Sequence, residues 1–502
     1  RSCAVKISDA ASYRHRGVCI EGSCSFSHVS DMIEWLPKVG MNAYFNQFST
    51  PYCFFDYWYK KNQPATFEEV TAMVSVLTEQ IKKRGLMYHA TGHGWTCDPI
   101  GIKGNGWAVE EFTLTDEQRS LLAQVNGKRE VFGGIALNTN LCYSNPAVRE
   151  KIVNAITSYC REHCEVDYLH FWLADVDNNH CECENCKDTL PSDFYVQMLN
   201  ETDECLGNIP TKIVFLVYFD LLWEPAHARL KNTDRFTLMF APITRTYTKA
   251  FCEGDVEIPT ELAPYKRNKL EMPKTVGENI ARLKRWQEQF RGDSFDFDYH
   301  LIWDHYHDPG EYESARILFE DMKNLDRLNL NGMVSCQVQR AFFPTGFAMN
   351  AMAAALWNKN LTFESFAKTF FTDLFGKHAN EMQHYFKKLS TLFQPAYLRG
   401  ELPHVSKESA KLFAKIPSVI NKMLPKLISR REDILIIHAQ LCLQSAETLR
   451  LKAEGKQSEA EDRWSQTKDY VNQMEPVIHN ALDIKYFTDV IGRSIRGERM
   501  FG

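Results

Sequence analysis

Short apolar segments alternate with longer segments of helical periodicity along the first two-thirds of the chain. The apolar segments are rich in β-branched and aromatic residues, which favours strands. Eight strands are predicted: Gly17–Glu21, Asn42–Phe48, Leu86–Thr91, Tyr168–Ala174, Lys212–Tyr218, Phe236–Ala241, Ser294–His300 and Gly332–Gln337. The predicted helices between them are Ser27–Lys38, Thr66–Arg84, Pro146–His163, Ser192–Leu206, Thr275–Phe290 and Glu311–Leu328.

This alternation indicates a (β/α)8 TIM barrel over residues 1–346, because such barrels take ~250 residues plus insertions. A doubly wound open sheet is the alternative, but it more often has a glycine-rich first turn. The sequence contains neither G-x-G-x-x-G nor G-x-x-x-x-G-K-S/T, so it supports neither a dinucleotide site nor a P-loop.

The rest of the chain, residues 347–502, has a different pattern. It is rich in Ala, Leu, Lys and Glu at helical spacing, with a broad apolar stripe along Arg431–Lys452 and a second long helix over Gln457–Asn480. We predict an all-helical C-terminal domain that carries no chemistry. It would support the barrel or form a contact between two copies of the chain.

Composition excludes several classes of function. Hydrophobic residues make up 44% and charged residues 24% of the chain, as in ordinary globular proteins, and the net charge is −6. A nucleic-acid-binding protein would show a strongly basic surface, so we expect no nucleic-acid partner. No segment reaches the ~18 consecutive apolar residues of a membrane span. The first ten residues lack the apolar segment of a signal peptide.

The cysteines predict a reducing compartment and one metal site. The chain has an odd number, 15, without the spacing of a small disulfide scaffold, so we expect a cytoplasmic protein. Cys181, Cys183 and Cys186 form a C-x-C-x-x-C motif that would suit structural zinc. The fourth ligand would be His180, Cys164 or Cys205. The alternative is a loop with free thiols, and we expect catalysis to need no cofactor.

Function in a barrel of this type is found where the strands end. The residues at these ends combine carboxylates, histidines, arginines and aromatic rings, and we expect them to bind substrate: Glu21, His89, His93, Trp95, Tyr218, Trp223, Arg245, Tyr247, Asp298, His300, Trp303, Asp304, Gln337 and Arg340. A sugar offers an apolar ring face to tryptophan and tyrosine, and hydroxyls to polar groups. The set therefore predicts an oligosaccharide or glycoconjugate substrate.

Carboxyl groups after the fourth strand are the candidates for catalysis. Asp175 and Asp177 lie in the sequence A-D-V-D-N-N, and Glu182 follows shortly after. Glycoside cleavage uses two carboxyl groups. Where the sugar carries an N-acetyl group, its carbonyl can be the nucleophile, and the two carboxyl groups then orient the acetamide and protonate the leaving oxygen. The alternative for each of these residues is that it has no catalytic role and only stabilises a turn or faces solvent.

Five segments together resemble a bacterial protein family. They are HATGHGWTCDP (89–99), LHFWLADVDNNHCECENC (169–186), FAPITRTY (240–247), DFDYHLIWDHYHDPG (296–310) and VSCQVQRAFFPTG (334–346). The chain resembles domain-of-unknown-function family 4838, which is similar to glycoside hydrolases around the β-N-acetylhexosaminidases and α-glucuronidases. The resemblance covers roughly residues 13–346 and implies a catalytic barrel acting on a glycan. Family 20 hexosaminidases carry adjacent Asp-Glu where this chain has Asp175-Val176.

These observations leave four hypotheses. The leading one is an exo-acting, retaining, substrate-assisted glycoside hydrolase that removes a terminal N-acetylhexosamine (β-GalNAc or β-GlcNAc). The second, suggested by Arg245 and Arg340, is an α-glucuronidase or another hydrolase of acidic sugars. The third is a carbohydrate-binding protein without catalysis. The fourth is a zinc-dependent deacetylase that uses His89, His93 and Asp175.

Overall fold

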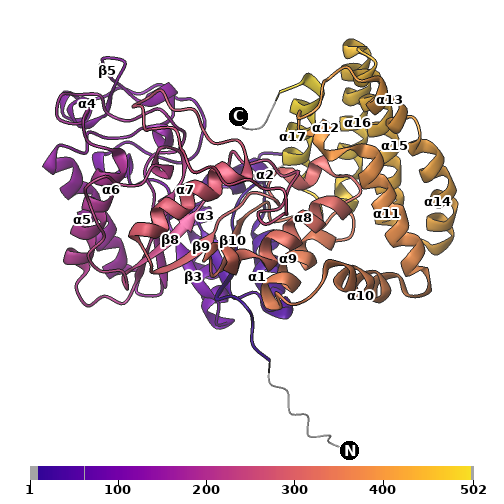
Figure 1. Ribbon diagram of the computed structural model, residues 1–502, viewed down its shortest axis with the longest axis horizontal. Helices are drawn as coiled ribbons and strands as arrows, with labels where there is room; N and C mark the ends of the chain where they lie inside the picture. Colours follow the sequence, from indigo (N-terminus) through magenta and orange to yellow (C-terminus); the bar gives the residue numbers. More distant parts are fainter. Residues whose placement is uncertain (1–8, 62, 499–502) are drawn as a thin grey trace, which may run out of the picture.

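The predicted strands form a closed parallel barrel in the computed structural model, which describes residues 9–61 and 63–498 (Figure 1). The expectation about a signal peptide falls mainly on residues 1–8, outside the described residues. The described barrel strands are β1 (His15–Cys19), β2 (Ala43–Asn46), β3 (Met87–Ala90), β6 (Tyr168–Phe171), β7 (Lys212–Val217), β8 (Phe236–Phe240), β9 (Asp293–Asp296) and β10 (Gly332–Cys336). Each pairs with the next in sequence, and β10 pairs with β1, which closes the barrel. The predicted fold class is confirmed.

Helices surround the barrel. They are α1 (Phe26–Trp35), α2 (Tyr52–Tyr59), α3 (Phe67–Lys83), α5 (Pro146–Glu162), α6 (Pro191–Leu206), α7 (Val276–Gln289), α8 (Tyr312–Lys323) and α9 (Phe347–Trp357). The pattern predicted all of them between the strands except α2, which was not predicted, and α9, which lies in the region predicted as the C-terminal domain. Helices α3 and α7 begin with capping boxes, in which a threonine and a glutamate three residues later satisfy each other's backbone N–H groups. Within the described residues, the β7–β8 connection holds only the 3-10 turn η5 (Phe219–Leu222) instead of an α-helix.

A long segment separates β3 from β6, and its α4 and β5 lie on the side of the molecule opposite the C-terminal helices (Figure 1). It contains α4 (Asp116–Leu121) and the small antiparallel sheet of β4 (Gln124–Val125) and β5 (Lys128–Arg129). This insertion supplies side chains to the site described below.

The remaining short 3-10 turns are η1 (Leu36–Val39), η2 (Asp98–Ile100), η3 (Phe132–Gly134), η4 (Ala136–Asn138), η6 (Asp304–His307), η7 (Leu325–Leu328) and η8 (Gly376–His378).

Helix α9 completes the barrel, so the domain boundary lies later than residue 346. It directly follows β10 and packs against α8. Its last residue, Trp357, accepts a hydrogen bond at its carbonyl from the Ser12 N–H at 2.8 Å, and the Arg16 guanidinium lies 5.6 Å from the Trp357 ring. The C-terminal helical domain therefore begins after Trp357.

The C-terminal domain is helical, as predicted, and gathers on the side of the barrel away from the α4–β5 segment (Figure 1). Its helices are α10 (Phe363–Phe375), α11 (Ala379–Phe393), α12 (Pro395–Leu398), α13 (Lys407–Phe413), α14 (Ile416–Arg430), α15 (Asp433–Ala453), α16 (Gln457–Ile478) and α17 (Ile484–Arg496). Buried phenylalanines join it to the barrel: the rings of Phe347 and Phe366 stack at 5.4 Å, and those of Phe319 and Phe363 lie 5.6 Å apart. In the described part of the chain, every helix is too short or too polar to cross a membrane.

Two residues that the sequence placed in the substrate site are buried inside the protein instead. His89 is fully buried, its Nδ1 is 3.0 Å from His170 Nε2, and its ring stacks on Tyr168 at 4.5 Å. Burial lowers the pKa of His89 well below its usual value, so the ring is neutral. Trp95 is also buried and donates from Nε1 to the His170 carbonyl at 2.9 Å. Both were predicted to bind substrate, and both instead pack in or against the core.

Candidate active site

A cavity of about 1210 Å³ opens where the barrel strands end. In the described part of the chain, each barrel strand or the residues just after it contribute to the lining: Glu21, Gln47, His93, Asp175, Tyr218, Ile243, Tyr299 and Cys336. Active sites of TIM-barrel enzymes lie at this end. The cavity is therefore the candidate active site, and its size suits an oligosaccharide terminus.

Asp175 lies in this cavity after β6 and is held in one orientation. Its Oδ2 accepts a hydrogen bond from Trp107 Nε1 at 2.9 Å. Its Oδ1 accepts one from the Tyr218 hydroxyl, also at 2.9 Å. Trp107 comes from the β3–β6 insertion and Tyr218 from the end of β7, so two distant segments fix one carboxylate.

The turn that carries Asp175 has strained backbone geometry. Val176 has φ 57° and Asn178 has φ 56°, in the left-handed region, which is unusual above all for a β-branched residue. Such conformations cost about 1–3 kcal/mol each and persist where the surroundings hold them. Here the Asp175 N–H donates to the Leu137 carbonyl at 2.8 Å, and Asn179 Nδ2 donates to the Asp175 carbonyl at 2.8 Å.

The two other predicted catalytic carboxyl groups separate in the structure. Asp177 lines the cavity, and partial burial raises its pKa above the usual value. Glu182 does not reach the lining that the described residues form. Its oxygens instead accept from the Asn126 N–H at 2.7 Å and from Asn268 Nδ2 at 2.8 Å. Its prediction as a catalytic residue is therefore wrong, since these contacts hold it in the loop.

Glu21, predicted to bind substrate, is a stronger candidate for proton transfer. Its side chain lines the cavity but the residue is only 8% exposed. Burial raises its pKa to about 7, and the negative charge of Asp175 adds to this rise, while the hydrogen bond from Gln47 Nε2 at 2.6 Å opposes it. A carboxyl group with this pKa can both donate and accept a proton near neutral pH.

Aromatic side chains form most of the cavity walls. The predicted Tyr218, Trp223 and Trp303 line it, and Trp303 stacks on Tyr299 at 5.0 Å. The sequence reasoning missed further aromatic lining residues, which are Phe54, Tyr57, Trp107, Trp172, Phe219, Phe297, Tyr299 and Tyr486. Trp172 was within reach, since it lies three residues before Asp175 at the same strand end. Trp107 and Tyr486 carry no local signal, because only the fold brings them to the barrel mouth.

His93 lies among these rings, as predicted for a residue of the site. It lines the cavity, stacks on Phe48 at 5.1 Å, and meets the edge of Trp172 at 4.7 Å. Burial lowers its pKa to about 4, so the imidazole is neutral at physiological pH. A neutral ring of this kind suits a hydrogen bond to a sugar hydroxyl.

Four predicted site residues form a buried network behind the cavity wall instead. Arg245 Nη1 lies 2.8 Å from Asp298 Oδ2 and 2.9 Å from Asp321 Oδ2. The Tyr247 hydroxyl donates to Asp298 Oδ1 at 2.5 Å, and His300 Nε2 is 2.9 Å from Asp321 Oδ2. Buried carboxylates need such partners to offset their desolvation. Arg245, Tyr247, Asp298 and His300 were therefore wrongly predicted to contact substrate.

Asp304 and Gln337 are also occupied by protein contacts. Arg399 binds Asp304 through both oxygens, at 2.6 and 2.8 Å, and holds the Asp304 pKa below its usual value against the opposing effect of burial. Gln337 is buried with its Nε2 3.1 Å from Met349 Sδ. Both predictions of substrate contact are wrong, because these side chains join the barrel to helices outside it.

Arg340 connects the barrel to the C-terminal domain. Its Nη2 lies 3.2 Å from Asp483 Oδ1, and it donates to the carbonyl groups of Ser23 and Leu482. Asp483 caps α17 by accepting from the Tyr486 N–H at 3.1 Å. Because the Arg340 guanidinium is buried in these contacts, the prediction that it binds a substrate carboxylate is wrong.

Helix α17 takes part in the site, contrary to the expectation for the C-terminal domain. Tyr486, Asp489 and Arg493 line the cavity. They lie three and four residues apart on one face of the helix, which faces the barrel mouth. The helical domain therefore forms part of the wall as well as supporting the barrel.

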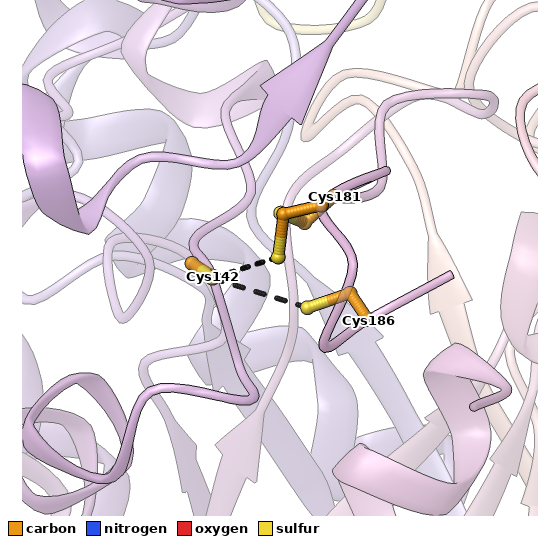
Figure 2. A group of neighbouring side chains, drawn as sticks. Cys142, Cys181 and Cys186 are labelled. Atoms are coloured by element: carbon orange, nitrogen blue, oxygen red, sulfur yellow. Dashed lines mark hydrogen bonds between the residues drawn. The ribbon is translucent and has the colours of Figure 1, made fainter. Parts of the chain in front are cut away.

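Four cysteines gather outside the cavity lining, and Figure 2 shows three of them, Cys142, Cys181 and Cys186. Cys181, Cys183 and Cys186 are joined by Cys142, from the segment before α5, which the sequence reasoning did not consider as the fourth member. The donors considered there lie elsewhere: Cys164 and Cys205 are exposed, and His180 Nε2 is 4.0 Å from Asp220. Cys142 could not be predicted from cysteine spacing, because it lies too far along the chain from the other three cysteines to form a compact motif with them.

The open metal site of the deacetylase hypothesis does not form among the described residues. His89 lies in the barrel interior, while His93 and Asp175 line the cavity. Besides the four cysteines, the described groups with metal-ligand spacing comprise Asp298, His300 and Asp321. Arg245 already neutralises that carboxylate pair.

Comparison with protein-family models gives no match for this chain, and comparison with curated proteins gives none either. Solved structures do resemble it. A GH138 enzyme that targets pectin rhamnogalacturonan II superposes with a TM-score of 0.50 at 12% identity, over 97% of this chain and 63% of its own. The GH89 protein of Clostridium perfringens gives 0.49 at 11%, over 97% and 58%. An O-GlcNAc hydrolase of Thermobaculum terrenum gives 0.43 at 11%, over 96% and 95%.

The resemblance to the GH138 enzyme is one of fold. It extends over both the barrel and the helices that follow, so the two parts occur together in that structure as well. At this identity it transfers no residue roles. The family suggested by the sequence motifs stays a prediction.

Proposed function

We propose that this chain is a glycoside hydrolase that acts in the cavity at the strand ends. One observation carries the proposal: two carboxyl groups with different partners face one aromatic-walled cavity. Asp175 is held by Trp107 and Tyr218, and Glu21 has a pKa near 7. Paired carboxyl groups with different environments are the requirement for glycosidic cleavage.

The roles follow from these environments. Glu21 protonates the glycosidic oxygen as the bond to the anomeric carbon breaks, and its carboxylate then accepts a proton from the water that completes hydrolysis. Asp175 stabilises the positive charge that develops on the sugar. Asp177, at the edge of the cavity, binds a hydroxyl of the same sugar.

We propose a terminal N-acetylhexosamine as the substrate. Trp172, Met239 and Phe297 form an apolar surface in the same cavity as Asp175. This surface suits an acetamide methyl group, while Asp175 accepts a hydrogen bond from the acetamide N–H. The acetamide oxygen would attack the anomeric carbon, and water would then open the cyclic intermediate with retention of configuration.

An acidic sugar is the second candidate, on different residues from those first considered. Arg245 and Arg340 bind protein carboxylates, but Arg282 lines the cavity with its guanidinium 4.1 Å from the Trp223 ring. An arginine beside a sugar platform could bind a uronate carboxylate. A uronide therefore belongs in the substrate panel.

The test is hydrolysis of nitrophenyl N-acetyl-β-galactosaminide, N-acetyl-β-glucosaminide and α-glucuronide by wild type and Asp175→Asn. We expect turnover of an N-acetyl substrate and a loss of about 10²–10⁴-fold in kcat/KM in the variant. Glu182→Gln is the matched control and should keep full activity. Turnover of the uronide alone would replace the substrate proposal, and binding without any turnover would identify a carbohydrate-binding protein.

A further inference from the structure

We propose that Cys142, Cys181, Cys183 and Cys186 bind one zinc ion in a closed structural site. The sulfur atoms of all four lie within 4.8 Å of one another. Figure 2 shows the side chains of Cys142, Cys181 and Cys186 directed toward a common point from two separate segments. Two groups of side chains in the described part of the chain have metal-ligand spacing, and this one consists entirely of cysteines.

The distances between sulfur atoms fit a tetrahedral metal site. Cys142 Sγ lies 3.7 Å from Cys183 Sγ and 3.9 Å from Cys186 Sγ. Zinc binds thiolates at ~2.3 Å, and the edge of such a tetrahedron is therefore ~3.8 Å. A disulfide would bring two sulfur atoms to ~2.05 Å, and all four cysteines are free.

The surroundings of the sulfur atoms favour thiolates. The Gln124 N–H donates to Cys181 Sγ at 3.3 Å, and Arg129 Nη2 is 4.0 Å from Cys142 Sγ. Zinc with four thiolates carries a net charge of −2, which these N–H and guanidinium groups offset.

The burial pattern argues against thiols that act as small apolar side chains. Cys142, Cys181 and Cys186 are buried in a cluster of their own with Ala123, separate from the main core. Cysteines that serve as apolar side chains would pack among leucine and phenylalanine, as Cys19 and Cys160 do in the main core. Soft, closed, four-sulfur coordination leaves no position for water, so the site is structural rather than catalytic.

The metal site would fix the segment that carries Asp175. Cys142 belongs to the insertion and the other three cysteines to the β6–α6 loop. Between them, Asn140 Nδ2 donates to Asn179 Oδ1 at 2.7 Å, and Asn179 Nδ2 donates to the Asp175 carbonyl. Asn140 Oδ1 also accepts from the Ala174 N–H at 3.3 Å. The zinc ion therefore joins the two segments that hold the strained turn, and its importance for activity rests on the proposed function.

The experiment measures bound metal in the purified protein by elemental analysis, in wild type, Cys142→Ser and Cys164→Ser. We expect about one zinc per chain in wild type and in Cys164→Ser, an exposed cysteine. Cys142→Ser should lose at least tenfold in zinc affinity, measured by competition with a chromogenic chelator. Cobalt substituted for zinc in wild type should give the intense thiolate-to-metal and d–d absorption of a tetrahedral four-sulfur site.

A thiol count on the folded protein provides a second test if Cys142→Ser does not fold. Four thiols that are protected in the zinc-loaded wild type should react after chelation. The proposal would be overturned if wild type bound less than about one zinc per chain, or if it bound iron instead. It would also be overturned if Cys142→Ser bound zinc as tightly as wild type. These readouts do not depend on glycoside turnover, so failure of the proposed function would leave them interpretable.

Discussion

Burial and pairing of single side chains decide which of the polar residues at the barrel mouth can act. Glu21 and Asp304 are both buried carboxyl groups close to strand ends, yet their pKa values move in opposite directions. Arg399 neutralises Asp304. Among the described residues, Glu21 instead accepts hydrogen bonds from the Gln47 amide and the Gly22 N–H, and it lies near the charge of Asp175. The neutral form of Glu21 is therefore populated near pH 7, and that of Asp304 is not.

The pKa of Glu21 predicts how kcat/KM decreases at alkaline pH. Because its pKa is about 7 and the protonated form is the acid, kcat/KM should fall about tenfold per pH unit above pH 7 in wild type. Glu21→Gln should lose this pH dependence together with most activity on the nitrophenyl substrate. A dinitrophenyl glycoside, whose leaving group needs no proton, should restore bond cleavage in the variant. An unchanged alkaline limb in Glu21→Gln would exclude Glu21 as the acid.

The same group affects stability with a defined sign. The folded protein holds the Glu21 proton more tightly than the unfolded chain, so this contribution is complete below about pH 4.5 and is lost as the pH rises through about 7. The total change is roughly 3 kcal/mol. Urea unfolding at pH 5 and pH 8 should show a smaller decrease in the free energy of unfolding for Glu21→Gln than for wild type.

At the scale of elements, the site depends on joints between segments distant in the chain. The β6–α6 turn is held by the insertion through Leu137 and Trp107, and α17 is held against the barrel by Arg340. Each joint places a side chain in the cavity that its own element could not position. Loss of a joint should therefore affect both stability and activity.

Arg340→Met tests the α17 joint. It leaves Asp483 buried without its cation, and we expect a loss of about 3–5 kcal/mol in the free energy of unfolding. We also expect lower kcat/KM on every substrate, because Tyr486 shifts from the wall. Arg496→Met, at an exposed pair with Glu498, is the control and should change stability by less than about 1 kcal/mol. A variant of normal stability that loses only uronide hydrolysis would instead restore the substrate role of Arg340.

On the scale of the whole molecule, barrel and helical domain share a continuous core. Phe319 and Phe347 on α8 and α9 pack with Phe363 and Phe366 on α10, across the boundary between the two parts. All are buried. The two parts should consequently unfold together rather than as independent domains.

Calorimetry tests this coupling. We expect one thermal transition for the whole chain in wild type. Phe347→Ala should destabilise by about 3–5 kcal/mol, because it leaves a cavity among rings that cannot fully collapse. Phe67→Ala, at a position on α3 that is 42% exposed, should change the free energy of unfolding much less than Phe347→Ala does. Two separate transitions in wild type would show that the domains unfold independently.

The sequence by itself determined the barrel, the helical C-terminal region and the strand ends that surround the cavity. These follow from local periodicity, since alternation of strand and helix patterns along the chain is preserved in the fold. Asp175, Glu21 and Tyr218 could be predicted because residues that follow a barrel strand in the sequence lie at the end of the barrel where the cavity opens. Three of the four clustered cysteines were found for a similar reason, as their spacing within one loop keeps them together.

Only the tertiary structure decided which of these residues face the cavity and which are bound elsewhere. Arg245 and Asp298 look like ligand residues in the sequence, but each finds the other across the fold and is buried with it. Cys142, Trp107 and Tyr486 belong to segments distant in the chain, so no local sequence pattern indicates that they lie near these sites. The physical reason is that desolvation and pairing of charges depend on neighbours far away in the chain, whereas strand and helix patterns depend on neighbours close by.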